Sequence, residues 1–150
     1  MNTLTLGQEV TLISGQLATV QQLMADGQVK VRFICDTCSL TVSRDKVRPV
    51  VAKHDGSTGC AKALLNVMVN HGCGFGYNDR AASMSLDHMT GAANSMRSEM
   101  LHILAEYRHD TAPEIAAMRS AVVGLTGFVG VMVGLKCISD LKAVLVRGLA

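Results

Sequence analysis

The side chains in this sequence that could hold a metal ion are cysteines and a histidine. Cys35 and Cys38 form a C-x-x-C motif, and Cys60, His71 and Cys73 follow it along the chain. A structural zinc ion needs four sulfur or nitrogen ligands in a tetrahedral arrangement. The motif could supply one pair and two of the later residues the other, although these lack the usual paired spacing. We therefore expect a protein without a cofactor, with zinc on Cys35, Cys38, Cys60 and Cys73 as the alternative.

Other chemistry of cysteine and glycine motifs is poorly supported. A redox C-x-x-C lies at a helix N-terminus after a strand, whereas this one falls between two strand-like runs. Nothing in the sequence places His71 or His88 beside the thiol of Cys73 as a base. The glycines of residues 72–76 lack the preceding strand and the G-x-G-x-x-G spacing of a dinucleotide loop. We expect that the protein is not an enzyme.

One local basic cluster, made of Arg44, Lys46, Arg48 and Lys53, stands out in a chain whose net charge is only +2. Residues 1–75 carry seven Lys or Arg and five Asp or Glu, and residues 76–150 carry seven of each. Neither half has the excess expected of a strong nucleic-acid binder. The cluster is either a solvated rim or a phosphate-binding patch. The residues that would bind nucleic acid are Lys30, Arg32, Arg44, Lys46 and Arg48.

Short strand-like runs occupy residues 4–50 and would position this basic cluster. Val29, Val31 and Phe33 alternate with charged residues, which is the period-two pattern of a strand. Asp26 and Gly27 form a turn signal before that run. Five such runs in so short a segment predict a small barrel. Residues 51–58 then read as a polar linker.

The order of these runs resembles an SH3-like barrel of the Tudor or KOW type. The resemblance rests on Gly7–Val10 in the first strand, Gly15–Val20 in the second, Gly27–Phe33 in the third and Asp45–Val50 at the close. It covers about residues 4–50 and implies a binding module for RNA, peptides or protein partners. Phe33 is the only aromatic residue of that stretch, so an aromatic cage for methyl-lysine is not expected.

From residue 59 the apolar period becomes helical. Residues 59–71 and 80–108 are predicted to form helices, and the second carries a seam of apolar residues at steps of three and four. The seam consists of Leu86, Met89, Ala93, Met96, Met100, Ile103 and Tyr107. Such a seam packs against a partner helix, either in the same chain or in another copy, and we leave both alternatives open.

A capping box at Thr111–Glu114 predicts a further helix that runs to about Ile138. Gly124, Gly127 and Gly134 lie roughly on one of its faces. Each glycine costs roughly 1 kcal/mol relative to alanine inside a helix, so we expect another helix to approach this face closely. The uncharged stretch 120–135 falls just short of the length that spans a bilayer. A buried helix is therefore expected rather than a membrane span.

Together these patterns predict an α+β protein. A small SH3-like β-barrel at 1–50 is joined by the linker at 51–58 to a helical bundle or oligomerisation region of three to four helices at 59–150. The expected function is that of a non-catalytic structural or assembly protein, a homo-oligomer or a subunit of a larger complex such as a viral or phage particle. The alternative is a nucleic-acid or regulatory binding module. The N-terminal residues lack the pattern of a secretory signal, so an intracellular or virion location is expected.

Overall fold

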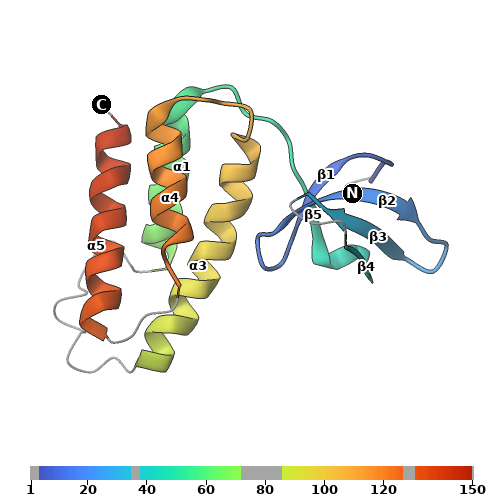
Figure 1. Ribbon diagram of the computed structural model, residues 1–150, viewed down its shortest axis with the longest axis horizontal. Coiled ribbons are helices and arrows are strands. Elements are labelled where there is room, and N and C mark those ends of the chain that lie inside the picture. The colour runs from blue at the N-terminus through green and yellow to red at the C-terminus, as the bar shows by residue number, and fades with distance from the viewer. Residues whose placement is uncertain (1–3, 35–37, 72–85, 127–130, 150) are drawn as a thin grey trace.

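The computed structural model describes residues 4–34, 38–71, 86–126 and 131–149, and it confirms the predicted α+β class. An antiparallel sheet comes first, followed by four helices in the described ranges (Figure 1). The strands are β1 (Glu9–Leu12), β2 (Leu17–Leu23), β3 (Gln28–Phe33), β4 (Ser39–Ser43) and β5 (Val47–Pro49), with the 3₁₀ turn η1 (Arg44–Lys46) before β5. The helices are α1 (Gly56–Asn70), α3 (Leu86–Glu106), α4 (Pro113–Val123) and α5 (Val131–Gly148).

The sheet has the strand order β4-β3-β2-β1-β5, and it is open where the sequence predicted a closed barrel. β4 and β5 are its two edges in the described residues, because η1 carries the chain from β4 to the far side, where β5 pairs with β1 alone. The alternating apolar side chains face inward, as the period-two pattern predicted. Their core consists of Leu4, Val10, Ala18, Val20, Val29, Val31 and Val47.

The four helices pack so that each contacts the other three. Their common core is built from aliphatic and methionine side chains, and Leu64, Met96, Met100 and Leu141 are fully buried in it. With so few aromatic residues, this core relies on the flexible methionines to fill space between the helices. The part of the chain described contains no helix with the combined length and hydropathy that a bilayer crossing demands.

The helix predicted from Thr111 to Ile138 is in fact two helices. α4 ends at Val123 with Gly124 as its C-cap, and α5 begins at Val131 and continues to Gly148. The N-terminal prediction was also wrong, because Ala112 occupies the N-cap and the Asp110 carboxylate accepts a hydrogen bond from its amide at 2.9 Å. A helix end at Gly124 removes the cost of holding that glycine inside a helix.

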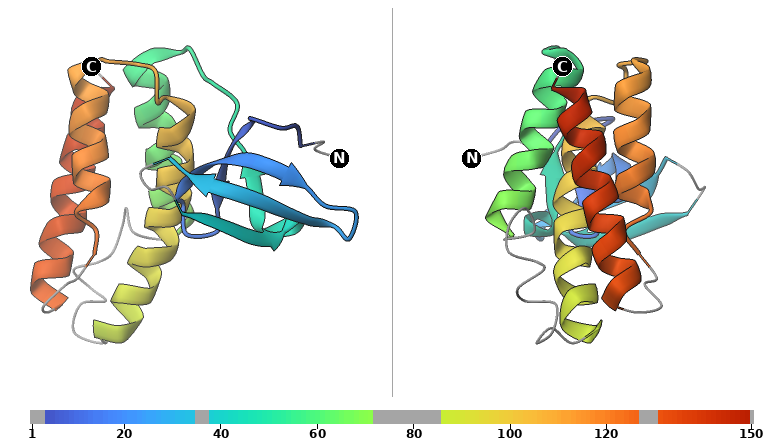
Figure 2. Two further views of the ribbon diagram at one scale, coloured as in Figure 1. Left: turned by 45° about the vertical axis from the view of Figure 1, so that its right-hand side comes forward. Right: turned by 90° about the vertical axis from the view of Figure 1, so that its left-hand side faces the viewer.

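The sheet lies to one side of the helices, next to α3, and α5 lies on the far side of the bundle (Figures 1 and 2). The chain between β5 and α1 runs along the C-terminal end of α3, where the amide of Lys53 donates to the carbonyl of Glu106 at 2.9 Å. The hydroxyl of Tyr107 donates to Asp55 at 2.5 Å. These contacts bind the connecting segment to the bundle.

Candidate functional site

Strand β1 has two packed faces, and this places the sheet against helix α3. Val10 points into the sheet core, and Thr11, on the opposite face, is also fully buried. A hydrogen bond of 2.5 Å joins the hydroxyl of Thr11 to Nδ1 of His102 on α3. A buried hydroxyl without a partner would cost about 1–3 kcal/mol, so this bond satisfies the one buried polar side chain of the sheet that is described.

Two further contacts tie the sheet to α3. Glu9 forms an ion pair with Arg108, just beyond the helix end, and its other oxygen lies 3.8 Å from His109. Gly15, in the β1–β2 turn, adopts a φ of +85°, and a Cβ there would lie 2.8 Å from both Leu101 Cβ and the carbonyl oxygen of Ser98. The turn therefore approaches the helix as closely as only glycine allows.

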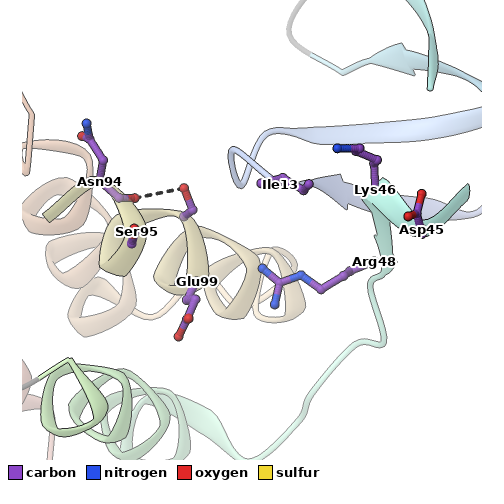
Figure 3. A pocket seen from close by; sticks show the side chains of 8 residues that line it. Ile13, Asp45, Lys46, Arg48, Asn94, Ser95 and Glu99 are labelled. Carbon is purple, nitrogen blue, oxygen red and sulfur yellow. Dashed lines mark hydrogen bonds between the residues drawn. The ribbon is translucent and has the colours of Figure 1, made fainter. Parts of the chain in front are cut away.

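A groove of about 490 Å³ opens where η1, β5 and the β1–β2 turn meet α3. We call it the junction groove. Arg48 extends from β5 toward the helix, and the helix wall is formed by consecutive turns of α3 (Figure 3). The hydroxyl of Ser98 donates to the carbonyl of Asn94 at 3.0 Å. The lining residues are Ile13, Asp45, Lys46, Arg48, Asn94, Ser95, Ser98 and Glu99.

The charges of the junction groove are arranged so that its cations are unpaired. Glu99 Oε1 lies 3.3 Å from His71 Nε2 of the α1 C-cap, so that carboxylate has a partner elsewhere. Within the described ranges, Lys46 and Arg48 take part in no ion pair. Both side chains belong to exposed residues. Two solvated cations beside amide and hydroxyl groups can bind an anion through charge and direct its orientation through hydrogen bonds.

The charge of Arg48, which lines this groove, also acts on His102 of α3. Burial lowers the pKa of His102, and the nearby guanidinium of Arg48 lowers it further. Burial raises the pKa of Glu106, one turn along α3, whereas Lys53 and Arg48 oppose that rise. Burial and the charge of Arg48 therefore both favour the neutral form of the His102 imidazole.

The five basic residues predicted to act together lie on two separate surfaces. Lys46 and Arg48 line the junction groove, and Arg44 is exposed at the start of η1. Lys30 and Arg32 alternate along β3 with the buried Val29 and Val31, so they lie on the outer face of the sheet. One ligand at the groove would thus not need all five.

The cysteines proposed as zinc ligands are not brought together where they are described. Cys38 is exposed next to β4, whereas Cys60 is fully buried in the helical core. Burial raises the pKa of the Cys60 thiol to about 11, which disfavours the thiolate that binds metal. Cys35 and Cys73 lie outside the described residues. Among those described, no group of three or more His, Cys, Asp or Glu side chains is placed to hold a metal ion.

The predicted helix-interface residues are largely used inside the chain. Ala93, Met96, Met100 and Tyr107 are buried, and Ile103 is half-buried against the same core. Leu86 and Met89 lie in the first turn of α3, where only the backbone is described.

The glycine face is divided between helix ends. Gly124 is the exposed C-cap of α4, Gly134 is buried within α5, and Gly127 lies outside the described residues. The three predicted positions therefore do not form one stripe along one helix.

Sequence reasoning missed the helix wall of the groove. Asn94, Ser95 and Ser98 carry no motif, and the only signal was that they fall between the seam positions of α3.

Comparison with protein-family models, with curated proteins and with solved structures gave no match.

Proposed function

We propose that this protein is a non-catalytic binding module that takes the phosphate backbone of a nucleic acid into the junction groove. Lys46 and Arg48 would contact phosphates, and Arg44 would extend the basic surface along η1. The observation that carries the proposal is a groove in which Lys46 and Arg48 take part in no ion pair within the described residues and face amide and hydroxyl groups of α3. The carboxylates of Asp45 and Glu99 also line the groove, and that of Glu99 lies 3.3 Å from His71.

The chemistry of the lining supports contact with phosphate rather than readout of bases. Phosphate contacts come from Lys and Arg and from hydroxyl and amide side chains. The sheet's only aromatic side chain, Phe33, packs partly buried against the sheet core, so it offers no stacking platform. Binding is therefore expected to be salt-sensitive and to show little sequence preference.

The SH3-like relationship of residues 4–50 is kept as part of this proposal. Two features support this relationship. The strands follow one another in the order that the resemblance implies, and a 3₁₀ turn comes immediately before the last strand. Binding to RNA, peptides or protein partners is the general role implied by that resemblance.

The test is binding of a fluorescent single- or double-stranded oligonucleotide, measured by anisotropy over a range of salt concentrations. The variant carries Lys46→Ala and Arg48→Ala. The matched control carries Lys62→Ala and Lys136→Ala, which remove two exposed charges from α1 and α5. We expect the groove variant to bind more weakly and to lose about two units of the salt slope, about one per phosphate contact. Equal losses in both variants would refute the proposal.

Assembly into a larger complex remains a second candidate. Exposed apolar side chains occur on α5 and directly after it, where Val133, Val146 and Leu149 are each more than a third exposed. Self-association through the described α3 seam is disfavoured, because those side chains are buried in their own chain. Light scattering at micromolar concentration tests this candidate, and a monomer that binds oligonucleotide would favour the groove instead.

A further inference from the structure

Strand β4 has one unpaired edge, and the hydrogen bonds of its other edge show which groups are free. Phe33 donates its amide to the carbonyl of Cys38, and Arg44 donates its amide to the carbonyl of Gly27. The register between these two bonds is regular, with Val31 opposite Leu40 and Val29 opposite Val42. Because backbone groups alternate sides along a strand, positions 40 and 42 bond to β3. The amides and carbonyls of Ser39, Thr41 and Ser43 therefore point away from the sheet.

On strands β2, β3 and β4, the outer face beside this edge carries positive charge and no negative charge. Lys30 and Arg32 lie opposite Thr41 and Ser39, and strands β2, β3 and β4 contain no acidic residue. Neither cation takes part in an ion pair within the residues described. The side chains of β4 on this face are short hydroxyls, so they leave room above the strand.

Side chains on this face reach across a neighbouring strand. The hydroxyl of Ser39 on β4 donates to the amide oxygen of Gln21 on β2 at 2.8 Å, over the intervening β3. Lysine and arginine are longer than glutamine. Lys30 and Arg32 can therefore reach a carboxylate on a strand added beyond β4, which would lie about 10 Å from β3, two strand spacings away.

The inner face at the same edge is apolar and incompletely covered. Leu40 lies opposite the buried Val31 and yet is 44 % exposed, because the open sheet has no further strand at this edge in the described residues. Val42 packs partly against the sheet core. An added strand would meet hydrocarbon on this face and cations on the other.

We propose that the free edge of β4 binds an extended acidic segment of a partner protein by β-sheet augmentation. The segment would bond through its backbone to Ser39, Thr41 and Ser43. Its acidic side chains would lie toward Lys30 and Arg32, and its alternate apolar side chains would cover Leu40. An extended peptide fits better than a nucleic acid, because only a peptide backbone supplies alternating donors and acceptors at strand spacing.

The test uses a synthetic peptide that alternates glutamate and valine, with a lysine–valine peptide as its counterpart. Calorimetry gives the affinity, and amide hydrogen exchange locates the bound segment. We expect binding of the acidic peptide alone, with slower exchange at Ser39, Thr41 and Ser43. Thr41→Pro removes an outward amide without cutting a β3–β4 bond, so it should abolish binding, whereas Thr41→Ala should retain it.

Charge removal gives a second, independent variant. Lys30→Ser with Arg32→Ser should weaken peptide binding about fivefold, two cross-strand charge pairs being lost. The Lys46→Ala, Arg48→Ala variant should bind the peptide normally, since the inference does not rest on the junction groove. Undiminished binding by Thr41→Pro, protection of other amides only, or binding of an oligonucleotide but no peptide at Lys30 and Arg32 would each overturn the proposal.

Discussion

The helical bundle and the sheet of this protein differ in what they bury. The bundle encloses side chains such as Leu64, Met96 and Met100. The described apolar seam of α3 is buried in this core. The buried core of the sheet contains no side chain larger than leucine, since Phe33 is only partly buried against it, and the strands leave basic and hydroxyl groups exposed. The difference indicates that the bundle supplies most of the stability, whereas the sheet presents the groups available for binding.

The largest expected effect contrasts the two cores directly. Leu64→Ala should lower the free energy of unfolding by about 2–5 kcal/mol, because a fully buried leucine leaves a cavity among packed helices. Val29→Ala in the sheet removes fewer carbon atoms and should cost about 2 kcal/mol. Urea denaturation of both variants measures the difference. A sheet variant as destabilised as the helix variant would contradict the division of roles.

The next effect concerns the contact that joins the two regions. Gly15→Ala and Gly27→Ala each place a side chain at a positive φ, which costs about 1–2 kcal/mol. At Gly27 the added Cβ meets open space, whereas at Gly15 it meets α3. We therefore expect Gly15→Ala to lose about 1–3 kcal/mol more than Gly27→Ala in thermal or urea unfolding. Equal losses would mean that the turn does not press against the helix.

A smaller effect should appear as a pH dependence at the same junction. The pKa of His102 is lower in the folded protein than in the unfolded chain, where it is about 6.5. As the pH falls, the unfolded chain therefore takes up the proton first. The stability that the folded protein gains from keeping His102 neutral is therefore fully present above about pH 6.5, and it is lost as the pH falls below that value. Urea denaturation should give a lower free energy of unfolding at about pH 5.5 than at about pH 7.5. This decrease should be smaller in the His102→Gln variant than in the unaltered protein. The raised pKa of Glu106 acts in the opposite direction, and it is common to both proteins.

The smallest effect tests the charge balance of the sheet side of the groove. Asp45→Asn removes a carboxylate beside Lys46 and should raise affinity for an oligonucleotide about twofold to threefold at low salt. Asp26→Asn is the matched control, because it lies in the β2–β3 turn, where an asparagine oxygen can still accept from the amide of Gln28. An equal gain in both variants would point to general charge attraction instead of the groove.

The local elements followed closely from the sequence, and the larger arrangement did not. The strand at Val29–Phe33 and the long helix through Met96 were predicted from periods of two and of three to four residues. The barrel closure and the continuous helix from Thr111 to Ile138 were wrong. One error concerns where a helix ends, and the other concerns whether two edge strands pair. The spacing of apolar residues along the chain encodes neither.

Only one wall of the candidate groove could be predicted from the sequence. Lys46 and Arg48 formed a visible basic cluster, but Asn94 and Ser98 on the opposite wall are separated from them by the whole of α1. The set of residues predicted to bind nucleic acid also grouped Arg32 with Lys46, although β3 and η1 present them on different surfaces. Neighbours in sequence were taken as neighbours in space.

The sequence by itself determined which segments are strands and which are helices, because side-chain alternation and helical spacing are local consequences of the backbone. It also determined that Met96 and Met100 share one face of α3. Only the tertiary structure decided what that face meets, and it is the protein's own core rather than a second copy. It likewise decided that Thr11 meets His102 and that Arg48 faces α3. Those contacts depend on how two separate cores pack against each other, and this packing involves residues that lie far apart in the sequence.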